Sequence, residues 1–226
     1  MKEKEVSQSF TKAINNVFGF EWKIYFCKFF FSKKNQVTLL TLKREKELKQ
    51  VLAKFFVWGD REKEEEILNL CASRNVKVPK VLGSFSNILF MEYLPGKSLG
   101  KATKEELFLY IPLLINWLTS FGEAFKDRAL CRGDITFSNF IWFKEEIYGI
   151  DFEEVHIGNL LEDIKELTIN LLLKGFTLEE LKNIYPQFII EDIINFKKSI
   201  FTHYLCKKFI WGDEETKKRC LTLLSL

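Results

Sequence analysis

The sequence predicts an α+β protein with an antiparallel, β-rich N-terminal part, residues 1–94, and a mainly helical C-terminal part, residues 95–226. Aromatic and β-branched residues are concentrated between residues 22 and 57, the pair Pro95-Gly96 interrupts the chain, and helical patterns dominate beyond it. Because 47% of the residues are hydrophobic and 23 are Phe, the chain has enough apolar material for an extensive core.

The N-terminal part is expected to form a five-stranded sheet with a leading helix over residues 1–20. Polar turn sequences separate its first strands, which therefore pair antiparallel. The Phe-rich stretch 26–31 is interpreted as packed sheet. After the leading helix we expect, in order, three strands, a helix and two strands, at about 22–31, 36–43, 48–57, 60–74, 76–82 and 88–93.

The C-terminal part is expected to open with a helix from Thr103 to about Phe125. Thr103 and Glu106 form a capping-box sequence, which is typical of a helix start. Pro112 predicts a kink or a junction inside this helix. A loop-rich stretch with two short strands follows over residues 129–157.

Beyond that stretch the pattern is helical to the end of the sequence. From Leu160 onward it predicts about four helices, one of them long, near residues 190–209.

Composition excludes several classes of protein. The net charge is +3, from 34 basic and 31 acidic residues, which gives no electrostatic case for binding nucleic acid. The five cysteines include no CxxC motif and there are two histidines, so neither a disulfide framework nor a structural zinc site is predicted.

The same features indicate a cytoplasmic protein. The charged N-terminus lacks the apolar stretch of a signal peptide, and free cysteines fit a reducing compartment. The apolar run Leu107–Leu118 is too short to span a bilayer and is interpreted as a buried helix, so no membrane partner is expected. The oligomeric state is not readable from the sequence.

Two polar clusters flanked by apolar, strand-like residues indicate phosphoryl transfer. Asp134 and Asn139 lie five residues apart, and Asp151 follows downstream. Phosphoryl transfer needs one carboxylate to orient or deprotonate the attacking hydroxyl and further oxygen ligands for Mg²⁺.

The segment from Arg132 to Asn139 resembles the His-Gly-Asp, four residues, Asn pattern of the aminoglycoside phosphotransferases and the choline or ethanolamine kinases. Asp151-Phe152-Glu153 is similar to the Asp-Phe-Gly position of protein kinases, and the form with Glu is familiar from choline-kinase-like proteins. The resemblance covers about residues 36–170 and implies a bilobal, protein-kinase-like fold.

The resemblance also implies roles for the residues of both clusters. Asp134 would be the catalytic base, and Asn139 and Asp151 would ligate Mg²⁺. Asp163 would brace the catalytic loop. Arg132 stands where the family usually has His, and it either supports the loop or binds a phosphate or an acidic substrate.

The N-terminal part offers matches to an ATP site. Lys54 lies in a segment that resembles the strand whose lysine holds the α- and β-phosphates. In the helix that follows, Glu64 best matches the ion-pair partner of this lysine, and Glu65 and Glu66 are alternatives. Glu153 is interpreted as a surface or loop-stabilising charge.

Residues 91–94 resemble the hinge that binds adenine. The backbone of Glu92 and Leu94 would meet the adenine edge, with Met91 behind it. The clear departure is the phosphate-covering loop, residues 31–36, which has no glycine to let backbone N–H groups approach the phosphates. Side chains of this loop are an alternative source of contacts.

The sequence therefore predicts a kinase that uses ATP and Mg²⁺ and transfers a phosphoryl group to a hydroxyl of a small molecule such as an aminoglycoside, choline or a sugar. No long activation segment follows Asp151, which argues against a peptide substrate. The alternatives are an atypical protein kinase or ATPase of the RIO or tRNA-threonylcarbamoyl-complex type, a lipopolysaccharide-core sugar kinase, and a nucleotide-binding pseudokinase.

Overall fold

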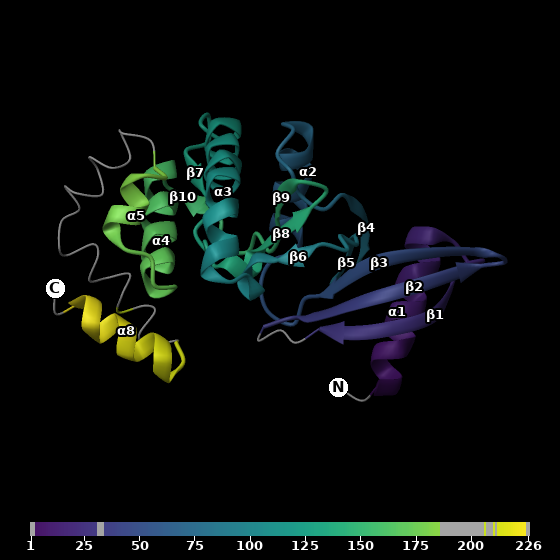
Figure 1. Cartoon of the computed structure of the whole chain (residues 1–226). Helices are drawn as coiled ribbons and strands as arrows, with labels where there is room; N and C mark the ends of the chain where they lie inside the picture. Colours follow the sequence, from purple (N-terminus) through teal and green to yellow (C-terminus); the bar gives the residue numbers. More distant parts are fainter. Residues whose placement is uncertain (1–2, 31–33, 186–205, 207–209, 211, 225–226) are drawn as a thin grey trace. The chain divides into compact units, whose positions relative to one another are not determined.

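A computed structural model of the chain describes residues 3–30, 34–185, 206, 210 and 212–224 (Figure 1). The contacts divide the chain into two compact units. The first unit comprises Met1–Gly96 and Tyr148–Glu153, and the second comprises Lys97–Ile147 and Glu154–Leu226. The sequence placed the boundary after Leu94. It did not foresee that a short downstream segment joins the first unit, where the Gly149 N–H donates to the Lys77 carbonyl at 3.1 Å.

The first unit is built on one antiparallel sheet with the strand order β1-β2-β3-β5-β4 (Figure 1). The long β2–β3 hairpin turns at Glu45, whose φ of 51° is left-handed. The strands are β1 (Lys23–Phe30), β2 (Gln36–Arg44), β3 (Glu47–Phe55), β4 (Val81–Phe85) and β5 (Ile88–Glu92).

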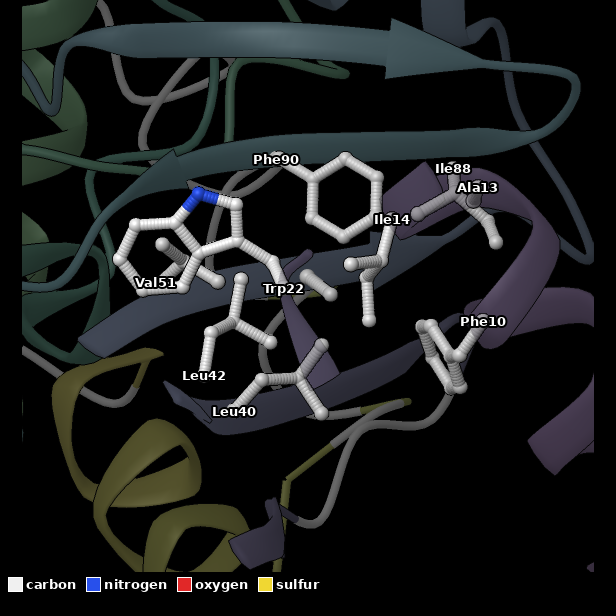
Figure 2. Packing of buried hydrophobic residues seen from close by; sticks show 10 residues of the cluster. Phe10, Ala13, Ile14, Trp22, Leu40, Leu42, Val51, Ile88 and Phe90 are labelled. Carbon is white, nitrogen blue, oxygen red and sulfur yellow. The ribbon is translucent and has the colours of Figure 1, made fainter. Parts of the chain in front are cut away.

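One face of this sheet is covered by α1 (Glu3–Phe18), the leading helix that the sequence predicts. Figure 2 shows Phe10 and Ile14 of α1 gathered with Leu40, Leu42 and Val51 of the sheet. Because side chains alternate along a strand, the residues between these apolar ones point to the other face.

The helix α2 (Arg61–Ser73) packs against β4 and β5. Asp60 caps its N-terminus, and the Asp60 side chain accepts a hydrogen bond from the Lys63 N–H at 3.0 Å. Its buried side chains recur at helical spacing and include one acid, Glu64, together with Ile67, Leu68 and Cys71.

Two expectations for this unit are wrong. The Phe-rich stretch is an exposed strand, since Phe26 and Phe29 are 56% and 54% exposed. The strand expected at 76–82 begins only at Val81, because Pro79 lacks the N–H that a ladder needs.

The second unit opens with β6 (Lys97–Ser98), η1 (Leu99–Lys101) and α3 (Lys104–Ala124). The capping box of Thr103 and Glu106 is present, which confirms the predicted helix start, and α3 continues through Pro112. Among the described residues α3 is the one helix long and apolar enough to cross a membrane. Phe108 and Leu109 of this helix are exposed, whereas seven of its apolar side chains are buried in this unit, namely Leu107, Ile111, Leu114, Ile115, Trp117, Leu118 and Phe121.

The loop-rich stretch contains four short strands where the sequence predicted two. They are β7 (Leu130–Cys131), β8 (Phe140–Phe143), β9 (Glu146–Gly149) and β10 (His156–Ile157), with η2 (Phe137–Asn139) before β8. β6, β8 and β9 form one small sheet, and β7 pairs with β10 in another.

Three helices of the C-terminal region are described, namely α4 (Leu160–Leu173), α5 (Leu178–Lys182) and α8 (Glu214–Leu224). The long helix predicted near 190–209 falls almost wholly outside the described residues. Asn159 caps the N-terminus of α4, and its side chain accepts hydrogen bonds from the N–H groups of Leu161 and Glu162. This helix carries Asp163 in its first turn and buries it.

Candidate active site

In the first unit, three carboxylates surround the amine of Lys54. The Nζ atom lies 2.7 Å from Glu64 Oε2, 2.9 Å from Asp151 Oδ1 and 2.8 Å from Glu153 Oε1. Of the three acids weighed for the ion pair, Glu64 is the partner, while Glu65 pairs with Arg61. The structure thus brings together Lys54, Glu64 and Asp151, as the sequence predicts.

Strand periodicity explains why a lysine can occupy this buried position. Val51 and Ala53, in the same strand, are fully buried in the core beneath α1. Lys54 therefore points to the opposite face of β3, where Glu64 approaches from α2. Both side chains are almost wholly buried, with 6% and 1% exposed, so their charges depend on each other.

The surroundings keep Lys54 charged. Burial acts against the ammonium form, but the negative charges of Glu64 and Asp151 outweigh it and raise the pKa of Lys54 above its ordinary value. A permanently charged amine in a carboxylate-lined position can hold phosphate oxygens.

Asp151 has the features of a metal ligand. Its φ of 63° lies in the left-handed region, which is uncommon for a residue other than glycine and often marks a functional site. Its side chain is 49% exposed, and ligand oxygens of Glu64, Asp151 and Glu153 all lie within 4.8 Å of one another. The three oxygens point at the Lys54 amine, which fills the space between them. Mg²⁺ prefers carboxylate ligands, and Asp151 offers one at a half-exposed position.

Glu153 is the residue of this cluster that sequence reasoning missed. Its side chain is only 11% exposed and pairs with Lys54. Of the two interpretations left open, the surface charge is therefore wrong, and the loop-stabilising charge is compatible with the contacts of Glu153. It also accepts a hydrogen bond from the Nδ2 of Asn35. Its position directly after Asp151-Phe152 is the one sequence signal that pointed to it.

Asn35 connects the glycine-free loop to this cluster. It is 5% exposed, and its Oδ1 accepts from the N–H groups of Val57 and Trp58 at 3.0 and 3.2 Å, while its Nδ2 donates to Glu153. The described end of this loop is thus held by side-chain hydrogen bonds where glycines were expected from the resemblance. Residues 31–33 lie outside the described part of the chain.

In the second unit, Asp134 is held by its own loop. Its Oδ1 accepts from the backbone N–H and the hydroxyl of Thr136, and its Oδ2 accepts from Asn139 Nδ2 at 3.0 Å. Because the Asn139 amide nitrogen is used in this bond, its carbonyl oxygen is the atom left to ligate a metal ion. Asp134 and Asn139 thus lie together, as predicted.

The buried side chains of Asp163 and Arg132 hold the backbone of this loop through hydrogen bonds. Asp163 is 2% exposed and its two oxygens accept from the backbone N–H groups of Arg132 and Gly133 at 2.8 and 2.9 Å. Arg132 is fully buried and its Nη1 donates to the Asp134 carbonyl at 2.6 Å. Of the two roles left open for Arg132, the structure therefore favours loop support.

We expect the stability of the protein to fall as pH rises from about 4 to about 6. Burial raises the pKa of Asp163 from 3.8 to about 6, against the lowering effect of its bonds from Arg132 and Gly133. Because the folded state holds this proton more tightly than the unfolded state, the stabilisation is complete below pH 3.8 and is lost through pH 6. The loss is up to about 3 kcal/mol.

Urea unfolding of wild type and Asp163→Asn across this range measures the effect. The variant carries no charge at position 163 at any pH, so it should lack this part of the pH dependence. Asp127→Asn, at an exposed position, is the matched control and should keep it. Equal pH profiles for wild type and Asp163→Asn would contradict the assignment.

The hinge residues lie at and beyond the end of β5. Met91 and Leu94 are each 5% exposed, whereas Glu92 is exposed. The Glu92 N–H, which is not the group predicted to contact adenine, donates to the Lys80 carbonyl at 2.8 Å. The adenine contacts predicted for Glu92 and Leu94 remain predictions.

Comparison with known proteins shows the family and the fold of the chain. A family model of the RIO domain matches residues 15–156. No curated protein is close enough in sequence to count as a match. Many solved structures share the fold.

An ethanolamine kinase from Plasmodium vivax is 12% identical, with a TM-score of 0.58 over 91% of this chain and 83% of the kinase. A choline/ethanolamine kinase family protein from Mesorhizobium loti is 13% identical, with a TM-score of 0.54 over 88% of each chain. A spectinomycin phosphotransferase, solved with ADP and spectinomycin, is 11% identical, with a TM-score of 0.58 over 93% of this chain and 85% of its own. These similarities confirm the predicted α+β, kinase-like fold.

Proposed function

Because the chain belongs to the RIO-domain family, we propose that it is an ATP-dependent phosphotransferase that moves the γ-phosphoryl group of ATP to a hydroxyl group. The observation that carries the proposal is the buried ion pair between Lys54 and Glu64, at 2.7 Å, with Asp151 bonded to the same amine. Burying such charges is costly, which favours a functional reason for keeping them.

ATP and Mg²⁺ fit the residues present. Lys54 would hold the α- and β-phosphates, and Asn139 and Asp151 would ligate Mg²⁺ through oxygen atoms. Met91, Glu92 and Leu94 would receive the adenine. Asp134 would orient the acceptor hydroxyl and take its proton, since Thr136 and Asn139 already fix the position of its carboxylate.

We further propose a small molecule as the acceptor. The supporting observation is the short chain between Asp151 and the start of α4 at Leu160, which leaves no long segment to hold a peptide. The structural neighbours include kinases of ethanolamine and choline and a phosphotransferase of spectinomycin, which supports an amino alcohol, a sugar or an aminoglycoside as the acceptor. A cytoplasmic location also remains a prediction.

The family assignment favours a second candidate. A match to the RIO domain is compatible with an atypical protein kinase or an ATPase, whose product is a phosphorylated protein or free phosphate. The two candidates share the nucleotide site described above and differ in the acceptor alone.

Mg-ATP should raise the thermal unfolding midpoint of the protein. A ligand at about 100 times its Kd stabilises a folded protein by about 2.7 kcal/mol. ATP in the presence of a chelator is the control and should give a smaller shift. Absence of any shift at millimolar Mg-ATP would favour the pseudokinase alternative.

Labelled ATP identifies the acceptor. The protein is incubated with Mg-ATP and a panel of amino alcohols, sugars and aminoglycosides, and the products are separated. Label on one of these small molecules is the expected result. Label found only on protein, or only as free phosphate, would contradict the small-molecule proposal and leave phosphotransfer itself standing.

A further inference from the structure

Three side chains with metal-binding atoms meet in the second unit, outside the set of residues assigned to ATP or Mg²⁺. Cys131 lies in β7, His156 lies in β10, and Glu162 lies in the first turn of α4. We propose that these residues, here called the Cys-His-Glu cluster, bind one Zn²⁺ ion. No zinc site is predicted from the sequence, because these ligands are far apart along the chain and form no short motif.

The ligand atoms already lie at nearly the right separations. Cys131 and His156 are register partners in the antiparallel β7–β10 pair, so their side chains share one face. Cys131 Sγ lies 3.3 Å from His156 Nε2, which lies 3.9 Å from Glu162 Oε2, and all three ligand atoms fall within 4.8 Å. Ligand atoms around a tetrahedral zinc ion are about 3.3–3.6 Å apart, so small side-chain shifts suffice.

Neighbouring groups orient two of the ligands. His156 Nδ1 lies 2.8 Å from the Glu154 carbonyl oxygen, which can only accept, so the ring proton is on Nδ1. In the neutral ring the lone pair of Nε2 then points toward Cys131, as in zinc sites whose histidines bond a backbone carbonyl. Asn159 Nδ2 donates to Glu162 Oε1 at 3.2 Å, and Oε2 is the oxygen nearer His156.

A glycine keeps space open beside the cluster. A Cβ atom at Gly158 would lie 2.5 Å from Cys131 Sγ and 3.0 Å from Glu162 Oε2. Any side chain there would fill the space next to two of the ligands. The side chains of His156 and Glu162 are 54% and 38% exposed, so an ion can enter from solvent.

The charges of the site favour a cation, and the atoms favour zinc. The carboxylates of Asp163 and Glu162 surround Cys131 with negative charge. The same negative charges attract a divalent ion, which would displace the thiol proton to solvent and bind the thiolate. Thiolate and imidazole ligands select zinc over magnesium.

A bound ion would fasten β7 to β10 and to the start of α4. Cys131 directly precedes Arg132 and Gly133, the residues whose N–H groups Asp163 holds. The role of the ion is therefore to brace the loop that carries Asp134. It takes no part in phosphoryl transfer.

Cobalt titration of the chelator-treated, intact protein tests the site. Co²⁺ should bind with a stoichiometry of one per chain, produce the absorption of a cobalt–thiolate bond, and be displaced by Zn²⁺. Cys131→Ser should abolish this absorption and weaken zinc binding by more than about 100-fold. Glu162→Gln and Gly158→Ala should each weaken it by about 10-fold or more.

Two further variants keep the result interpretable. Cys27→Ser removes an exposed cysteine of the first unit and should leave the cobalt spectrum unchanged. If Cys131→Ser does not fold, His156→Ala at a half-exposed position serves in its place and should weaken zinc binding similarly. No saturable cobalt–thiolate absorption, or absorption that survives loss of Cys131 or of His156, would overturn the proposal.

Discussion

Replacing Asp134 by alanine should lower the rate of phosphoryl transfer by about 10²- to 10⁴-fold, the range typical of a positioned acid or base. The carboxylate is held by Thr136 and by Asn139 at 3.0 Å, so the substitution removes a positioned base. The buried side chains that hold the backbone of this loop remain in place. Single-turnover kinetics with saturating Mg-ATP measure the effect on the chemical step.

Two variants in the same loop separate the chemistry from the geometry. Asp134→Asn keeps the shape and can still accept from Thr136, but it cannot take a proton, so its rate should fall like that of the alanine variant. Ser138→Ala, at an exposed position, is the matched control and should turn over normally. Turnover near the wild-type rate in Asp134→Asn would show that another group is the base.

Replacing Lys54 by methionine should abolish nucleotide binding and destabilise the first unit by about 3–5 kcal/mol. The amine neutralises Glu64, which is 1% exposed, and it also pairs with Asp151 and Glu153. Removing it leaves a buried carboxylate without its cation. Urea unfolding and the thermal shift with Mg-ATP measure the two effects separately.

A second substitution identifies the cause of the instability. Glu64→Gln in the Lys54→Met background should recover part of the lost stability, because it removes the unpaired charge, but it should not restore nucleotide binding. Lys28→Met, on the exposed strand β1, is the matched control and should be close to wild type. A Lys54→Met protein as stable as wild type would contradict the importance of the buried pair.

Local signals predicted most of the secondary structure. Alternation of apolar residues located β2 and β3 to within a residue or two of their observed bounds, Gln36–Arg44 and Glu47–Phe55. The capping box at Thr103 placed the start of α3. These elements are recognisable because the hydrogen bonds and the alternation that define them involve residues close together in the sequence.

Elements that depend on distant partners were predicted poorly. Leu130–Cys131 and His156–Ile157 are strands only because they pair with each other across the loop. Phe26 and Phe29 have a strong strand propensity, yet the sequence cannot tell that nothing in the described chain covers them. Propensity fixes the backbone of a strand, whereas burial depends on what packs against it.

The residues of the candidate site also divide into those that local patterns predict and those that depend on distant contacts. Asp134, Asn139 and Asp151 were proposed as site residues from residue type and spacing, and Lys54 from the resemblance to kinases. Glu153 was interpreted as a surface or loop-stabilising charge, because nothing in its neighbourhood along the chain shows that it reaches Lys54.

By itself, the sequence determined the fold class and the order of the elements, and it predicted the chemical character of the site, because alternation, capping and motif spacing are local properties of the chain. Only the tertiary structure decided which charges meet. It selected Glu64 over its neighbours, added Glu153 and Asn35 to the cluster, and brought Cys131 next to His156. Contacts between residues far apart in the sequence are set by packing, and a single sequence does not record them.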